Sequence, residues 1–314
     1  MLDGPLLKPR AARSGDRVAI IAPASPFPVE AFEAGVGELR RLGFEPVFEP
    51  GVFSRRGYVA GDPASRARAL LAVFEDPAIT AVVAARGGYG SVELLPFLPI
   101  GAMRRHPKLL IGYSDITALL AFVTTRCGVA ALHGPCVAAG LHGGAAGYDE
   151  STFVRALTCA EPLGPLPAPT LESLVPGDAA GPLLGGNLTQ LAASMGTPYA
   201  FHPPAGCVLF LEEAGERPYR IDRLLTQLRF AGVLARACAV VFGELPGCDE
   251  PDASVTARGV VADALRGFPG PVVFGLPAGH TAGPALTLPL GVRARVTAGP
   301  SPSVEMLESS VVNE

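Results

Sequence analysis

A serine in the surroundings typical of a nucleophile lies within residues 109–117, which read Leu-Leu-Ile-Gly-Tyr-Ser-Asp-Ile-Thr. An apolar strand is expected up to the glycine. Apolar residues then follow from Ile116 at the i, i+3, i+4 and i+7 spacing of an amphipathic helix. Ser114 therefore lies at a sharp turn, where a hydroxyl stands clear of the sheet and the first helical N–H groups face the atom that it attacks. These residues alone also allow a second interpretation, in which Ser114 or Asp115 only caps the helix.

A serine nucleophile needs a base within hydrogen-bond reach, and the sequence has five histidines. His133 and His280 each end an apolar strand and meet a turn, a position typical of site residues. Either one could instead be a structural histidine that bonds a backbone carbonyl. By contrast, His106 lies in a basic loop, and His142 and His202 lie in glycine-rich or proline-rich segments.

Among the acidic residues, Glu212 is the candidate that would orient the base. It ends the apolar run 207–211, where a charge is unfavourable unless it has a partner. Alternatively, the strand has reached solvent there, and Glu212 and Glu213 are surface charges. Asp115 is better placed to cap the helix that follows the serine.

A glycine pair, Gly87-Gly88, follows another apolar strand and supplies backbone N–H groups to an oxyanion or to a phosphate. No G-K-[ST] motif is present, so nucleotide binding has weak support. The segment around Ser114 departs from G-x-S-x-G at Ile116, so it does not match the ordinary α/β-hydrolase turn either.

The elements that must position these residues alternate between strand and helix in the first 135 residues. Continuous apolar runs are typical of strands buried on both faces, and the alternation predicts a doubly wound, mainly parallel sheet. Such sheets bind ligands at the carboxyl ends of their strands, where both 86–90 and 112–115 would lie. The expected strands are 17–22, 45–48, 79–85, 108–111 and 129–133, with helices at 29–42, from 62 to Pro77, and from 115 to about 126.

The composition changes after Pro135, which predicts three parts: an α/β domain over 1–135, a connector over 136–180 with one helix near 150–159, and a second domain over 181–314. The second domain is expected to be α/β, with strands at 207–211, 237–242 and 271–276. A helix ending at Arg266 would be capped by Asp252 or Ser254. The tail is expected to add a small strand-rich, barrel-like part.

Composition and charge exclude several classes of protein. Hydrophobic residues make up 49% of 314 residues, which excludes disorder as the main state. A net charge of −4 suggests neither nucleic acid nor an anionic membrane as partner. No secretory signal or run of about 20 apolar residues is visible, and six scattered cysteines without a C-x-x-C pair indicate reduced thiols and no zinc site. We expect a cytoplasmic protein.

Several segments, taken together and in order from about residue 17 to 300, resemble the LD-carboxypeptidases. This family of muramoyl-tetrapeptide carboxypeptidases includes relatives that inactivate microcin-C-type peptide–nucleotides. The segments are Ala22-Pro23-Ala24-Ser25, Tyr58-x-Ala60-Gly61, Arg86-Gly87-Gly88-Tyr89-Gly90, Gly112–Thr117, His133-Gly134-Pro135, Gly185-Gly186-Asn187-Leu188, Leu211-Glu212-Glu213 with Asp222-Arg223, and Gly279-His280.

The resemblance implies a Ser–His–Glu triad, with Ser114 as the nucleophile, His280 as the base and Glu212 as the carboxylate. It also implies an oxyanion hole made by the backbone amides of Gly88 and Asp115. Further implications are a nucleotide-fold-like first domain that carries the serine, a second domain that carries the other two residues, a homodimer, and no metal or other cofactor. The implied substrate is a murein tetrapeptide, which would lose its terminal D-alanine during cell-wall recycling.

Two other functions stay open at this point. One is hydrolysis of a peptidyl-nucleotide antibiotic, although such enzymes favour an aromatic platform for the base and this chain has no tryptophan. The other is a non-catalytic ligand-binding protein with the same two-domain cleft. The group that holds the substrate carboxylate is not evident; Arg86 is a candidate by position, and an ion pair that stabilises its loop is the alternative.

Overall fold

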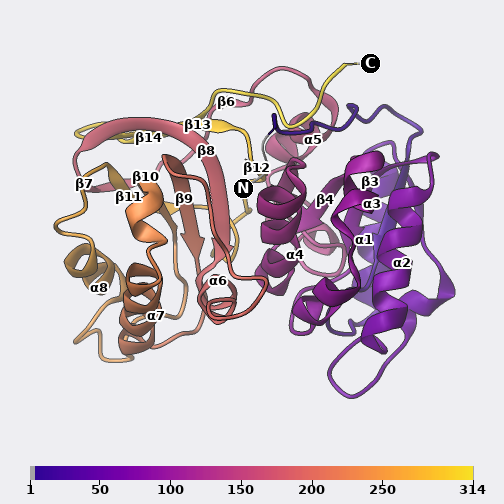
Figure 1. The fold of residues 1–314 in the computed structure, drawn as a ribbon, viewed down its shortest axis with the longest axis horizontal. Coiled ribbons are helices and arrows are strands. Elements are labelled where there is room, and N and C mark those ends of the chain that lie inside the picture. Colours follow the sequence, from indigo (N-terminus) through magenta and orange to yellow (C-terminus); the bar gives the residue numbers. More distant parts are fainter. Residues whose placement is uncertain (1–3, 314) are drawn as a thin grey trace.

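A six-stranded sheet forms the first half of the structure, a computed structural model that describes residues 4–313 (Figure 1). Its strands are β1 (Arg17–Ile21), β2 (Glu45–Val47), β3 (Ile79–Ala84), β4 (Leu109–Gly112), β5 (Ala131–His133) and β12 (Leu288–Leu290). They lie in the order β12-β5-β4-β3-β1-β2. The first five along the chain pair in parallel, as their continuous apolar runs predict, and β12 pairs antiparallel with β5.

Helices pack on this sheet through the apolar faces that the sequence predicts. They are α1 (Val29–Arg41), α2 (Pro63–Glu75), α3 (Ile100–Arg105), α4 (Thr117–Phe122) and α5 (Glu150–Thr158). Helix α1 buries Phe32, Val36 and Leu39, which share one face. Helix α2 begins as expected, because the Asp62 carboxylate accepts a hydrogen bond from the Ser65 N–H and proline occupies the first turn.

The single helix expected over 115–126 is in fact three consecutive segments. A 3-10 turn, η3 (Ser114–Ile116), precedes α4, and a π-helical segment, η4 (Val123–Cys127), follows it. The hydroxyls of Thr124 and Thr125 bond back to carbonyls in the preceding turn, and such bonds commonly accompany a distorted helix. Helical spacing predicts the buried face here, but not these changes of pitch.

The second sheet has eight strands and belongs to the C-terminal half. They are β6 (Gly164–Pro165), β7 (Glu172–Val175), β8 (Gly177–Asn187), β9 (Cys207–Glu212), β10 (Ala237–Gly243), β11 (Val272–Leu276), β13 (Arg293–Ala298) and β14 (Ser303–Met306). Their order is β6-β14-β13-β8-β9-β10-β11-β7. Strands β8 to β11 are parallel, whereas the tail forms the expected antiparallel hairpin, β13–β14.

Three helices accompany this sheet: α6 (Leu188–Ala193), α7 (Pro218–Phe230) and α8 (Ala257–Ala264). The cap expected for α8 is wrong. Thr256 caps it by accepting a hydrogen bond from the Gly259 N–H, while Asp252 accepts from Ser254 within the preceding turn. Several cap-forming residues lie close together before α8, so composition alone does not select one of them.

The two halves pack closely at α4 and β8, which lie side by side in the middle of the molecule (Figure 1). A Cβ on Gly186 would lie 2.6 Å from the Thr117 hydroxyl oxygen, so glycine permits this approach. The Asn187 N–H donates to the same hydroxyl at 3.0 Å. Because Thr117 lies three residues after Ser114, this contact sets the serine turn against the C-terminal sheet.

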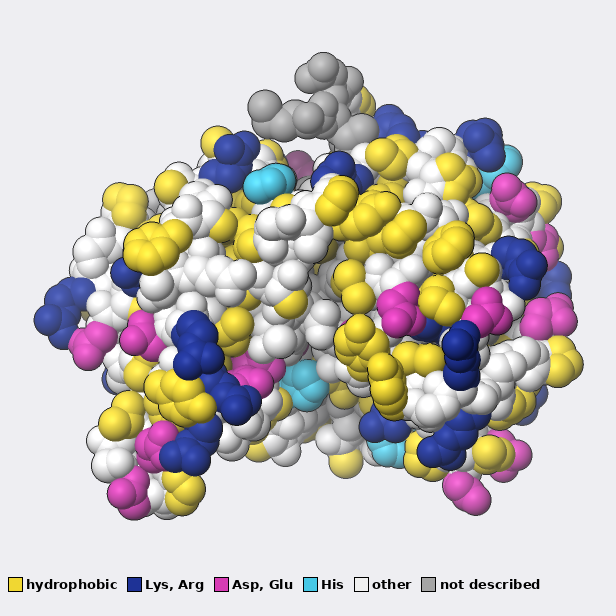
Figure 2. Space-filling model, turned by 60° about the horizontal axis from the view of Figure 1, so that its bottom comes forward, with side chains coloured by type: hydrophobic (Ala, Val, Ile, Leu, Met, Phe, Trp, Pro, Cys, Tyr) yellow, Lys and Arg dark blue, Asp and Glu magenta, His cyan; other side chains and the backbone are white. Residues whose placement is uncertain are grey.

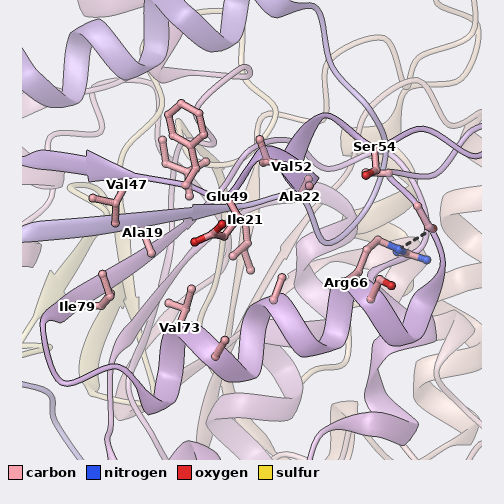
Figure 3. Close-up of a pocket in the computed structure, with 18 of the residues that line it drawn as sticks. Ala19, Ile21, Ala22, Val47, Glu49, Val52, Ser54, Arg66, Val73 and Ile79 are labelled. Atoms are coloured by element: carbon pink, nitrogen blue, oxygen red, sulfur yellow. Dashed lines mark hydrogen bonds between the residues drawn. The ribbon is translucent and has the colours of Figure 1, made fainter.

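The largest cavity described, about 820 Å³, lies between α2 and the β1–β2 edge of the first sheet. Figure 3 shows Ile79 toward one end of it and Arg66 with Ser54 at the other. Its lining includes none of the candidate triad residues. Figure 2 shows a different feature, a hollow between the two halves with hydrophobic side chains gathered along its right-hand side. Among the described helices, none has the length and apolar character needed to cross a bilayer.

Candidate active site

The turn that carries Ser114 is strained. Ser114 has a φ of 62°, in the left-handed region that residues with a side chain rarely adopt. Glycines on both sides leave it room: a Cβ on Gly112 would lie 2.8 Å from Ile116, and one on Gly87 would lie 3.0 Å from the Ser114 Cβ. Strain of this kind amounts to roughly 1–3 kcal/mol and persists only where the surroundings impose it.

Asp115 does not cap the helix, contrary to the expectation. Its buried carboxylate accepts a hydrogen bond from the Ser91 N–H at 2.8 Å, and its carbonyl accepts from the Ser91 hydroxyl at 2.6 Å. Burial raises the pKa of this carboxyl, although the Ser91 hydrogen bonds oppose the rise. The serine turn is thus tied to the loop that follows β3.

That loop, residues 86–91, holds the candidate oxyanion glycine against Ser25. The Ser25 N–H donates to the Gly87 carbonyl at 3.2 Å, and the Ser25 hydroxyl accepts from the Tyr89 N–H at 3.0 Å. Gly88 has a φ of +102°, and a Cβ there would lie 2.4 Å from the Ser25 hydroxyl oxygen, so only glycine fits. Among the described residues, no group accepts a hydrogen bond from the Gly88 N–H.

Arg66 of α2 braces the same loop from behind, a role that sequence reasoning missed. Its buried guanidinium donates to the carbonyls of Pro23, Gly61 and Gly90, and pairs with Glu93. The sequence did carry a signal for this role: Arg66 lies on the otherwise apolar face of an alanine-rich helix. A charge on that face would be buried and would need several acceptors.

Glu212 and His280, from distant parts of the chain, form a buried pair. Glu212 ends β9 and is fully buried, and its Oε2 lies 2.7 Å from Nδ1 of His280 and 3.0 Å from the His280 backbone nitrogen. Gly279 permits this approach, since its φ is +80° and a Cβ there would lie 2.7 Å from Oε2. The alternative that Glu212 is a surface charge is therefore wrong.

The electrostatics of the pair favour a charged glutamate beside a basic imidazole. Burial would raise the pKa of Glu212, but its bonds to His280 and the nearby His280 charge hold that pKa below its usual value. Burial would likewise lower the pKa of His280, and Glu212 raises it above its usual value. This arrangement suits an imidazole that takes up a proton during a reaction.

The turn of Ser114 contacts this pair through the residue that precedes the serine. The Tyr113 and His280 rings are 5.0 Å apart between centroids, in an edge-to-face arrangement. None of the hydrogen bonds described for these residues joins the Ser114 hydroxyl to the ring; catalytic hydrogen bonds are often long before substrate binds.

Glu213 is also buried but has a different task. Its carboxylate accepts hydrogen bonds from the Asn187 side chain and from the Thr189 N–H, each at 2.9 Å, and so it satisfies the start of α6. Of the two adjacent glutamates, Glu212 is the one that contacts His280.

The other four histidines differ in burial, as expected from whether or not they end an apolar strand. The side chains of His106, His142 and His202 are exposed. His133 is fully buried, with its Nε2 3.9 Å from Oε1 of Glu212. Arg86 is exposed, its guanidinium donates to the Pro26 carbonyl at 3.0 Å, and it forms no ion pair within residues 4–313.

A cleft of about 520 Å³ opens beside Tyr113 and His280. Its walls are mostly glycine, alanine and proline from the segments 134–147 and 279–286 and from Ala214, Pro246 and Gly247. Apart from His280, these lining residues carry no titratable group other than the Tyr113 phenol. A small or extended group can therefore lie against the imidazole without a bulky side chain in its way.

Known proteins match the chain along most of its length. It matches the LD-carboxypeptidase N-terminal domain over residues 18–134 and the LD-carboxypeptidase C-terminal domain over residues 180–296. The murein tetrapeptide carboxypeptidase of Pseudomonas aeruginosa is 34% identical over 273 residues, which cover 85% of this chain and 88% of that protein.

Solved structures agree with these matches. The muramoyltetrapeptide carboxypeptidase from Oxalobacter formigenes superposes with a TM-score of 0.81 at 28% identity, covering 93% of this chain and 99% of that one. The microcin C7 self-immunity protein MccF in its wild-type apo state superposes with a TM-score of 0.88 at 25% identity, covering 98% and 100%. The fold and the matches define a peptidase with a two-domain α/β architecture. The chain belongs to the LD-carboxypeptidase family.

Proposed function

We propose that this protein is a serine-type LD-carboxypeptidase that releases the terminal D-alanine of a murein tetrapeptide. The observation that carries the proposal is the buried Glu212–His280 pair beside the strained turn of Ser114. A base with a raised pKa, an anion that orients it and a serine hydroxyl are the parts that a serine peptidase requires.

In the proposed mechanism, His280 takes the proton of the Ser114 hydroxyl as its oxygen attacks the carbonyl carbon of the L,D-peptide bond. The N–H groups of Gly88 and Asp115 bind the oxyanion that forms. His280 then gives the proton to the departing amine of D-alanine, and the C–N bond breaks to leave an acyl-enzyme. Water, activated by His280, hydrolyses the ester and restores Ser114.

Release of D-alanine from murein tetrapeptide by the purified protein tests the proposal. We expect wild type and a Ser301→Ala control, in an exposed turn, to release it, and Ser114→Ala to lose a factor of about 10⁴. Labelling of wild type, but not Ser114→Ala, by a serine-directed fluorophosphonate would show the nucleophile directly. Equal release by wild type and Ser114→Ala would refute the serine mechanism, and no release by either would refute the substrate.

A second substrate has support from MccF, which superposes at a TM-score of 0.88 and is 28% identical over 312 residues. A peptidyl-nucleotide of the microcin C type would then be cleaved by the same Ser114 and His280. Assaying both substrates with one preparation decides between them. We place the murein peptide first because relatives named for it share higher identity with this chain.

We further propose that the protein acts in the cytoplasm as a homodimer, with domains over 1–135 and 181–314 and a connector over 136–180 whose strands β6 and β7 add to the second sheet. The family resemblance supports the dimer and the domain division. Light scattering on the purified chain tests the assembly, since a dimer would have twice the chain mass of 32.2 kDa.

A further inference from the structure

His133 is a buried histidine that the proposed mechanism does not use. It ends β5, is fully buried, and pairs in register with Gly112 of β4, two residues before Ser114. Neither ring nitrogen has a hydrogen-bond partner among the described residues. A polar group buried without a partner is unfavourable, so its retention at this position requires a reason.

The carboxylate of Glu212 also has one buried oxygen without a hydrogen-bond partner among the described residues. Its Oε2 accepts two hydrogen bonds from His280, but Oε1 is buried and accepts none among the described residues. A second basic group near Oε1 is His133, whose Nε2 is 3.9 Å away. Two unpartnered atoms of complementary character thus face each other across a gap slightly longer than a hydrogen bond.

We infer that His133 is a positioning residue for Glu212, whose Oε1 receives a hydrogen bond from the Nε2–H of His133, directly or through one buried water. Buried waters bind where polar groups lack other partners, and both atoms here meet that condition. The inference rests on the proposed function, since it concerns the carboxylate that orients His280. With both oxygens held, the carboxylate keeps Oε2 directed at the imidazole.

The surroundings keep His133 neutral, which this role requires. Burial lowers the pKa of His133 to about 4, while Glu212 opposes that shift and His280 adds to it. Its ring also packs against the aromatic rings of Phe210, with centroids 5.1 Å apart, and of Tyr113, at 6.3 Å. A neutral donor holds Glu212 without cancelling the negative charge that raises the pKa of His280.

Two substitutions of His133 separate a donor from a space-filling side chain. His133→Gln keeps an N–H near the position of Nε2, whereas His133→Leu fills a similar volume without a donor. With Leu, we expect kcat for D-alanine release to fall about 10- to 100-fold while KM changes little, because a donor to a buried charge is lost. The acid limb of kcat/KM should also move to lower pH, since a less firmly held Glu212 raises the pKa of His280 less. His133→Gln should keep most of the wild-type kcat and most of the wild-type position of the acid limb.

Nuclear magnetic resonance of histidine-labelled protein measures the same effect without activity. The His280 Nδ1–H resonance of wild type should titrate at a higher pH than in His133→Leu, and His133→Gln should resemble wild type. Unchanged titration and kcat in His133→Leu would overturn the inference even if wild type cleaves the tetrapeptide. Should the Leu variant fail to fold, His133→Asn, whose amide is too short to reach Oε1, replaces it; equal behaviour of Asn and Gln would overturn the inference.

Discussion

At the scale of single residues, the site depends on two adjacent glutamates that differ in their partners. Glu212 contacts His280, and Glu213 contacts the start of α6. We therefore expect Glu212→Gln to lose a factor of about 10⁴ in kcat, because an amide no longer holds the required imidazole tautomer.

Glu213→Gln is the matched control for that change. It should keep most of the activity but unfold at a lower temperature, since it weakens the hydrogen bonds to Asn187 and Thr189. D-alanine release and thermal unfolding, measured on both variants, check the pair. Loss of activity in Glu213→Gln with full activity in Glu212→Gln would reverse the assignment.

The pH dependence of activity follows from the raised pKa of His280. The base must be neutral to accept the serine proton, so kcat/KM should rise with pH through a midpoint above the ordinary value of 6.5. In Glu212→Gln this anion is absent, burial then acts against only the smaller effect of Glu213 on the imidazole, and the midpoint should fall below that of wild type. Initial rates below KM between pH 5 and 9 measure both midpoints; identical midpoints would contradict the coupling.

The same shifts predict where the pair stabilises the fold. The lowered pKa of Glu212 gives a contribution that is complete above the unfolded value of 4.5 and is lost as the pH falls through the folded pKa. The raised pKa of His280 gives one that is complete below 6.5 and is lost as the pH rises through the folded pKa. Both contributions are present together from about pH 4.5 to 6.5, so stability and activity have different pH optima.

At the scale of elements, glycines and one arginine hold the loops that carry these residues. Gly279 lets the strand end pass beside Glu212 with a positive φ. Gly279→Ala should reduce kcat strongly and destabilise the fold by at least about 1 kcal/mol, because its Cβ meets the carboxylate. Gly267→Ala, where nothing lies within 4 Å, is the control and should behave as wild type in assays and thermal unfolding.

Arg66 offers a test of the loop behind the oxyanion site. Arg66→Met should destabilise the protein by about 3 kcal/mol, because it leaves two buried carbonyls and one partly buried carbonyl without donors, and should lower kcat by displacing residues 86–91. Arg68→Met, on the exposed face of the same helix, should do neither. Denaturant unfolding and D-alanine release measure both effects. A stable, fully active Arg66→Met would show that the loop needs no such brace.

Strand-end positions made Ser114, Glu212 and His280 candidates, but His133 was an equal candidate by that argument, and it was the family resemblance that selected the three. Each follows a continuous apolar run, and the residues that end such runs face the carboxyl edge of a sheet. The partner of Asp115 could not be foreseen in this way. Ser91 is 24 residues away, and a short-range capping rule favours the neighbouring helix instead. The pairing of His280 with Glu212 depends on the order of strands in the second sheet, which periodicity does not fix.

At the scale of the whole molecule, the site exists only where the two halves meet. Strand β12 comes from the C-terminal half and completes the first sheet, while α4 packs against β8. Beside the turn of Ser114, a hydrogen bond crosses this junction from the Asn187 N–H to the Thr117 hydroxyl. The position of Ser114 relative to Glu212 therefore depends on contacts that belong to neither sheet alone.

Thr117→Val tests whether this junction sets the geometry of the site. The substitution preserves shape but leaves the buried Asn187 N–H without an acceptor, which is unfavourable by about 1–3 kcal/mol. If the structure relaxes so that the Asn187 N–H finds another acceptor, α4 should move away from β8. We therefore expect kcat to fall about 10-fold with a smaller change in KM. The control is Thr125→Val, because the Thr125 hydroxyl bonds only within its own helix, to the Ala121 carbonyl. A Thr117→Val protein with lowered stability and wild-type kcat would show that the junction holds the halves together without setting the reach of Ser114.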